Sequence, residues 1–328
     1  MLIRLFRSHQ NAQLLALVLG ILLLWGDAFI RLRPAETGSD LAPLYALLFS
    51  WSFSFPWLSS LLAVIMLVAQ ALLLNQILTD EGLAQRNSFL PAILMIMLLS
   101  YHPGLLCLHP AIPASFLLIL AMRMMLKARQ HEKAYQEVFS AALLLSLSAL
   151  INIYYLTLLP MIWIFLIINQ SYHWRDWVIS ILGLITPFVY LAFFYFMDDS
   201  LLQVIQSYGL VFMDLSWPQR ISGMSTAEWV VQGTLTFFLL LAFVRQISRA
   251  SEKVISLRRA YMMINWMLLM ALISVTMNTK QWVLTGSIIM VPAVITFTNW
   301  IQSSRKTRWQ ELFMWLILAG IAALKILL

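Results

Sequence analysis

The side chains best suited to chemistry in this sequence stand next to long apolar runs. Asp27 lies near the end of the first apolar run, and Glu36 and Asp40 follow in the polar stretch after it. A carboxylate held near a bilayer surface can accept a proton from a reacting hydroxyl group, which is general-base catalysis. We therefore treat Asp40 and Asp27 as candidate catalytic residues.

Further polar residues could bind a substrate near the same bilayer surface as these carboxylates. His102 and His109 flank a proline-rich loop, and Arg220 and Lys280 stand in later loops. Because arginine and lysine form charge-assisted hydrogen bonds to phosphate, these four are candidate substrate-binding residues for a lipid-linked phosphate. The sequence has no Gly-rich phosphate loop, no H-E-x-x-H and no zinc-type cysteine–histidine spacing, so we expect no cofactor and no metal.

Each candidate also has a purely structural interpretation. Asp27 can cap a helix or pair with Arg31, and Asp40 follows Gly38 and Ser39 as a helix N-cap would. His102 and His109 each precede a proline and can serve loop packing. Arg220 follows Trp217 and Pro218 and can contact a lipid headgroup. The sequence leaves both interpretations open.

The elements that must position these residues are membrane helices. Hydrophobic residues make up 62% of the 328 residues and charged residues 11%, whereas soluble domains average about 45–50% and about 25%. The first apolar run is followed by Arg31 and Arg33 without a cleavage pattern, so we expect a retained helix. The prediction is an all-α transmembrane bundle of about eleven spans forming one domain over 1–328. The expected spans are 12–30, 55–78, 88–102, 112–127, 138–151, 153–169, 177–197, 228–246, 260–277, 282–300 and 311–327.

One apolar stretch, from Leu41 to Leu78, is too long for a single span. Pro56 disfavours helix in the residue before it, so we expect a break there. We predict that Leu41–Phe53 is an interfacial or re-entrant helix and that Trp57–Leu78 is the span. Trp51 and Trp57 suit the headgroup boundary.

The basic residues predict the orientation. With a cytoplasmic N-terminus and alternating spans, the outer side receives Arg31, Arg33, Arg220, Lys280 and Lys325, and the other sixteen of the 21 Lys and Arg residues fall on the inner side. The positive-inside rule predicts this bias, so the net charge of +7 reflects membrane topology and no nucleic-acid partner is expected. The basic loop from Arg245 to Arg259 is either an anchor on anionic lipid or a partner-binding surface.

Two resemblances add expectations. Asn75-Gln-Ile-Leu, Arg86-Asn-Ser-Phe-Leu-Pro-Ala and the stretch from Met290-Val-Pro-Ala to Trp309-Gln-Glu-Leu-Phe resemble an uncharacterised Bacteroidota family of polytopic membrane proteins, which implies a Gram-negative inner membrane. The layout is similar to the membrane part of GT-C glycosyltransferases in three ways. The first outer loop contains acidic residues, and short spans between Leu90 and Ala121 bracket a proline-containing outer loop. From Ser140 to Phe165 a short span turns into a second one, which contains Pro160. That resemblance implies transfer of a sugar from a polyprenyl-phosphate donor, with Asp40 as the first-loop acid and Asp27 as the second choice. This sequence departs from the family in having no adjacent acids in that loop, histidines in the second outer loop and no outer soluble domain.

Three functions remain open from the sequence. The first is a GT-C-like glycosyltransferase whose partners are membrane lipids, including polyprenyl phosphate. The second is a non-enzymatic subunit of an envelope or secretion complex, with protein partners. The third is a transporter of a lipid or small solute, which would carry charged residues in mid-span. The predicted spans are nearly free of central charges, which disfavours ion coupling.

Overall fold

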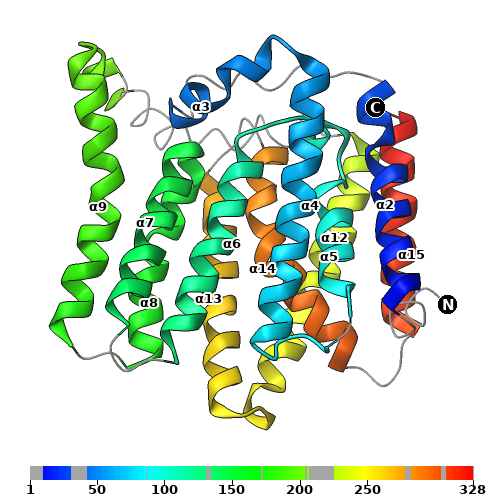
Figure 1. Ribbon diagram of the computed structural model, residues 1–328. Helices are drawn as coiled ribbons and strands as arrows, with labels where there is room; N and C mark the ends of the chain where they lie inside the picture. Colours follow the sequence, from blue (N-terminus) through cyan, green and yellow to red (C-terminus); the bar gives the residue numbers. More distant parts are fainter. Residues whose placement is uncertain are drawn as a thin grey trace.

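A computed structural model describes residues 10–30, 43–86, 88–130, 134–170, 173–203, 205–206, 225–277, 282–303 and 308–327. These described residues form helices and loops and contain no strand (Figure 1). The helices are α2 (Gln10–Ile30), α3 (Pro43–Phe53), α4 (Pro56–Asp80), α5 (Leu90–Leu99), η1 (Pro103–Leu105), α6 (Ala111–Ala128), α7 (Tyr135–Ile151), η2 (Ile153–Leu158), α8 (Met161–Ile168), α9 (Trp174–Met197), α12 (Thr226–Ser248), η3 (Ala250–Glu252), α13 (Ile255–Met277), α14 (Trp282–Ser303) and α15 (Arg308–Leu327).

Several of these helices match a bilayer in length and hydropathy. Among the described residues, five helices are long and apolar enough to cross a membrane, namely α4, α6, α9, α12 and α13. An α-helix rises about 1.5 Å per residue, so roughly 20 residues cross a hydrocarbon core of about 30 Å. The protein is therefore a multi-pass helical membrane protein. The remaining predicted ranges also coincide with helices, although the range 153–169 is divided into η2 and α8.

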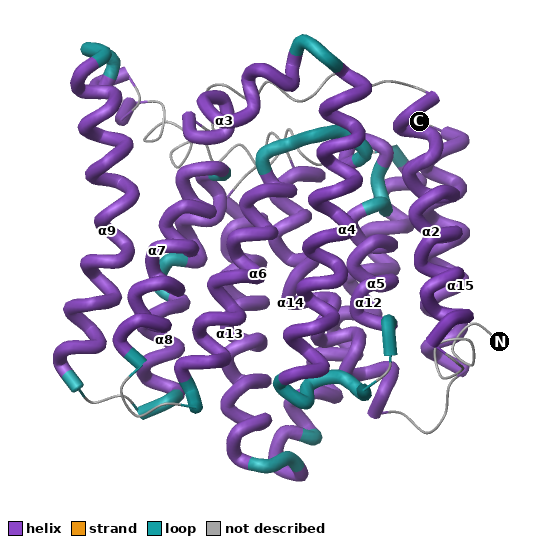
Figure 2. The backbone as a smooth tube through the Cα atoms, in the orientation of Figure 1, coloured by secondary structure: helices purple, strands orange, loops and turns teal. Residues whose placement is uncertain are grey.

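The helices form one bundle with two distinct ends, and the long helices run up and down in turn (Figure 1). At the lower end of this view α4 stops and α12 connects to α13; we call it the basic end, after Arg129, Arg249 and Lys253. We call the upper end the histidine end, because the connection from α5 to α6 there contains His102 and His109. Figure 2 shows this connection as a loop that crosses the upper part of the bundle behind α4 and below α3.

The break predicted at Pro56 is confirmed. Helix α3 ends at Phe53 and α4 begins at Pro56, where a ring without an N–H is tolerated at the first helical position. Figure 1 shows α3 lying across the histidine end instead of continuing the axis of α4. With 11 residues it is about 16 Å long, too short to cross the hydrocarbon core. Leu41 and residue 42 lie outside the described residues.

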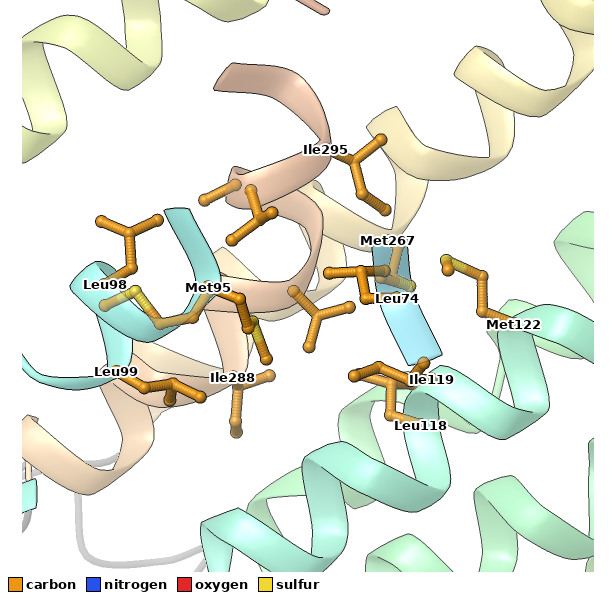
Figure 3. Packing of buried hydrophobic residues seen from close by; sticks show 14 of the residues in the cluster. Leu74, Met95, Leu98, Leu99, Leu118, Ile119, Met122, Met267, Ile288 and Ile295 are labelled. Carbon is orange, nitrogen blue, oxygen red and sulfur yellow. The ribbon is translucent and has the colours of Figure 1, made fainter. Parts of the chain in front are cut away.

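The core lies between α4, α5, α6, α13 and α14. Every residue of α5 is buried, as expected for a short helix that is apolar on all sides. Figure 3 shows side chains of these helices converging, with Leu74, Met95 and Ile119 among those labelled. Leu74 and Met95 are 0% exposed, which places α5 at the centre of the bundle. A helix buried in this way does not need the full length of a lipid-facing span.

Candidate functional site

The histidine end is built around the loop from Tyr101 to Pro110, which is packed inward instead of standing in solvent. Tyr101, Leu105 and Leu108 of this loop are at most 2% exposed. The indole Nε1 of Trp25 in α2 donates to Ser100 Oγ at 2.8 Å, and the hydroxyl of Tyr45 in α3 donates to the Leu108 carbonyl at 3.1 Å. Helices α2 and α3 therefore hold the loop from two directions.

His102 is fixed by both ring nitrogens. Its Nδ1 accepts a hydrogen bond from the Gly104 backbone N–H at 3.0 Å, which caps η1. Its Nε2 lies 2.9 Å from Glu228 Oε1 in α12. Because Nδ1 is used as an acceptor, the ring proton must sit on Nε2 and point to the carboxylate. In this arrangement neither nitrogen is available to act as a base on a substrate.

Glu228 completes the contact and was not among the candidates from the sequence. Its Oε2 accepts from the Ser225 backbone N–H at 2.6 Å, while Ser225 Oγ accepts from the Glu228 N–H at 3.2 Å. This is a capping box at the start of α12, and its signature, Ser-x-x-Glu before an apolar run, is visible in the sequence. The contact with His102 joins a loop to the first turn of α12, 126 positions away, and could not be read from local spacing.

His109 occupies a different environment within the same loop. Its side chain is 1% exposed, and neither ring nitrogen has a hydrogen bond of good geometry. Burial lowers the pKa of His109 to about 3, and a backbone group of Leu105 offsets a small part of that effect. The imidazole is therefore neutral, and a substrate has no access to it in this conformation.

The other predicted site residues are placed only in part. Asp27 is half-buried near the end of α2, at the histidine end. The Lys325 amine of α15 donates to the Leu24 carbonyl at 2.5 Å, so the ends of α2 and α15 meet one turn from Asp27. Asp40, Arg220 and Lys280 lie outside the described residues, as does Glu36. The structure thus places Asp27, His102 and His109 at one end of the bundle without testing their predicted roles.

Polar side chains inside the bundle mostly join helices. Gln70 Oε1 accepts from Ser115 Oγ at 2.7 Å between α4 and α6, and Gln246 Nε2 donates to Asn265 Oδ1 at 2.6 Å between α12 and α13. Hydrogen bonds between helices are a common role of amide side chains inside a membrane bundle. Asn152 differs, because its side chain accepts from Tyr154 N and caps η2.

The basic end has a dense polar network of its own. Lys253 Nζ donates to Asn299 Oδ1 at 2.7 Å and lies 3.6 Å from the centre of the Tyr261 ring. Partial burial lowers the pKa of Lys253 to about 8, and the charge of Arg249 adds to the effect. Arg129 bonds Glu81 at 2.7 Å and the Ser256 carbonyl at 2.6 Å. The network ties the hairpin between α12 and α13 to α4, α6 and α14.

No cluster of three or more histidine, cysteine, aspartate or glutamate side chains among the described residues could hold a metal ion. Comparisons with protein-family models, curated proteins and solved structures found no significant match. The family resemblances therefore remain predictions, and the geometry of the histidine end carries the functional argument.

Proposed function

We propose that the protein spans a bacterial inner membrane about eleven times, with the basic end in the cytoplasm and the histidine end outside. The alternating direction of the long helices supports this arrangement (Figure 1). So does the basic end itself, where Arg129, Arg249 and Lys253 gather on one side of the bundle, as the positive-inside rule predicts for the cytoplasmic side.

We further propose that the protein is a GT-C-like glycosyltransferase that uses a polyprenyl-phosphate-linked sugar. The observation that carries this proposal is α3, an apolar helix lying across the histidine end directly after the connection that contains Glu36 and Asp40. Trp51 and Trp57, at the join of α3 and α4, are 53% and 56% exposed, as suits residues at the headgroup boundary. A lipid-linked donor presents its reacting carbon at the depth of the headgroup boundary.

In the proposed reaction an acceptor hydroxyl attacks the anomeric carbon of the sugar. The bond from that carbon to the phosphate oxygen breaks, and the phosphate leaves on the polyprenyl lipid. Asp40, three positions before α3, takes the hydroxyl proton, and Arg220 or Lys280 offsets the charge of the leaving phosphate. Asp27 is the second choice for the base. His102, through its hydrogen bond to Glu228, holds the loop from Tyr101 to Pro110 in position.

The test compares Asp40→Asn with wild type in membranes supplied with an undecaprenyl-phosphate-linked hexose, measuring release of undecaprenyl phosphate. Loss of a general base lowers the rate by roughly 10²–10⁴-fold. Because asparagine is nearly the same size as aspartate and position 40 precedes α3, which begins at Pro43, the protein level should stay unchanged. Asp199→Asn is the control, since Asp199 is an exposed acid at the same end whose positive φ of 53° suits asparagine. Release by Asp40→Asn at the wild-type rate, or no release by wild type, would refute the proposed reaction.

A non-enzymatic subunit of an envelope or secretion complex is the second candidate, and α9 favours it. This helix stands at the edge of the bundle beside α7 and α8 (Figure 1), and only 22% of its apolar 18-residue segment is buried. Its free surface carries exposed Tyr190, Phe193 and Phe196. Under this function a protein should co-purify in mild detergent and be released by alanine at these aromatic positions.

Transport is the least supported of the three. The central turns of the described helices contain no aspartate, glutamate, lysine or arginine. Coupling to an ion usually requires such groups within the spans.

A further inference from the structure

A groove with a volume of about 380 Å³ runs along the seam between α12 and α15. Its α12 wall extends from Thr226 to Leu235, and its α15 wall from Leu316 to Ala323. The two threonines are the only polar residues that line it, and Thr234 Oγ1 turns back to the Val230 carbonyl at 2.7 Å. The groove therefore offers hydrocarbon contacts and little hydrogen bonding.

The groove opens sideways, away from the bundle core. Val230 on one wall is 69% exposed and Leu316 on the other is 43% exposed. Its floor is closed where the helices meet: a Cβ added at Gly320 would lie 2.9 Å from Val231 Cγ2. In a protein that spans a bilayer, a groove open to the side at this depth faces lipid tails and not water.

The length of the groove identifies the kind of chain that fits. The ten residues of the α12 wall span about 15 Å, which is half of a hydrocarbon core of about 30 Å. The α12 wall lies in the half of that helix nearest the histidine end, and the α15 wall runs from the middle of that helix toward the same end, since α12 begins and α15 finishes there. The groove thus matches the depth of one leaflet, whereas a longer polyprenyl chain would need a groove that continues past the bilayer centre.

We propose that this groove binds one acyl chain of a membrane phospholipid from the leaflet at the histidine end. The inference depends on the transmembrane arrangement and is independent of the transferase activity. Small side chains make the room: Ala319 and Ala323 occupy the α15 wall where larger residues would fill the space. The headgroup stays beyond Thr226, outside the hydrocarbon layer.

The experiment uses the full-length protein purified from native membranes, washed stepwise with detergent, with retained lipid identified by mass spectrometry. Ala319→Phe should fill the groove from α15, and Val230→Phe should narrow it from α12. Ala322→Phe is the matched control, because Ala322 is an exposed alanine on the same helix that does not line the groove. Thermal unfolding of each variant checks that it folds.

We expect wild type and Ala322→Phe to retain phospholipid through washes that strip it from folded Ala319→Phe and Val230→Phe. Equal retention in all four proteins would overturn the assignment. Retention of a polyprenyl lipid in place of a phospholipid, or of no lipid by wild type, would overturn it as well. Donor turnover is measured separately, so failure of this inference and failure of the proposed transferase give different results.

Discussion

At the scale of single residues, the two histidines of one short loop show how environment decides chemistry. His102 has an acceptor contact to Gly104 and a carboxylate partner in Glu228, which fix its tautomer. His109 is buried without a good hydrogen-bond partner, so its charged form is strongly disfavoured. The two histidines look alike in the sequence because each precedes a proline. Only tertiary packing gives them different environments.

The low pKa of His109 predicts a pH dependence of stability. The unfolded chain binds a proton at this residue below about pH 6.5, whereas the native protein does so only near pH 3. Stability should therefore fall as pH is lowered from 6.5 towards 3, by up to about 1.4 kcal/mol per pH unit from this residue. His109→Leu should flatten that slope in thermal unfolding of the detergent-solubilised protein.

The exposed His173 provides the control, as His173→Leu removes a histidine without changing the buried site. If His109→Leu keeps the wild-type slope between pH 6.5 and 4.5, the assignment of this loop as buried and neutral is wrong.

At the scale of elements, periodicity and proline positions were enough to predict most helices. The break at Pro56 follows from local backbone chemistry, and the structure has it. The division of the expected span 153–169 into η2 and α8 next to Pro160 was not predicted. Contacts between distant loops could not be predicted in this way, because nothing near His102 points to Glu228.

The packing of α9 on α7 gives a prediction at this scale. A Cβ added at Gly183 would lie 2.8 Å from both Ala142 Cβ and the Phe139 carbonyl oxygen. Since a backbone atom cannot easily move aside, Gly183→Ala should push the helices apart and cost about 1–3 kcal/mol, as overpacking does. A lowered unfolding temperature in detergent would show this.

Gly233 in α12 is the matched control, because a Cβ there would meet nothing within 4 Å. Gly233→Ala should be neutral or stabilise by up to about 1 kcal/mol through helix propensity. Equal effects of the two substitutions would contradict the close contact between α7 and α9.

At the scale of the whole molecule, the two ends of the bundle carry different side chains, and the long helices alternate in direction between them. The basic end carries the network of Arg129, Arg249 and Lys253, and the histidine end carries α3 and the enclosed loop. Composition alone predicts a membrane bundle, since 62% hydrophobic residues exceed what a soluble fold can bury.

Sidedness is the central claim, because every proposed role places the histidine end outside. Its most direct test is labelling of single cysteines with a membrane-impermeant maleimide in intact spheroplasts of cells expressing the protein, in a Cys107→Ser background. Asp198→Cys reports on the exposed end of α9 and Ser256→Cys on the exposed start of α13. We predict labelling of Asp198→Cys in intact spheroplasts and of Ser256→Cys only after permeabilisation. Labelling of Ser256→Cys in intact spheroplasts, with Asp198→Cys protected, would contradict the account.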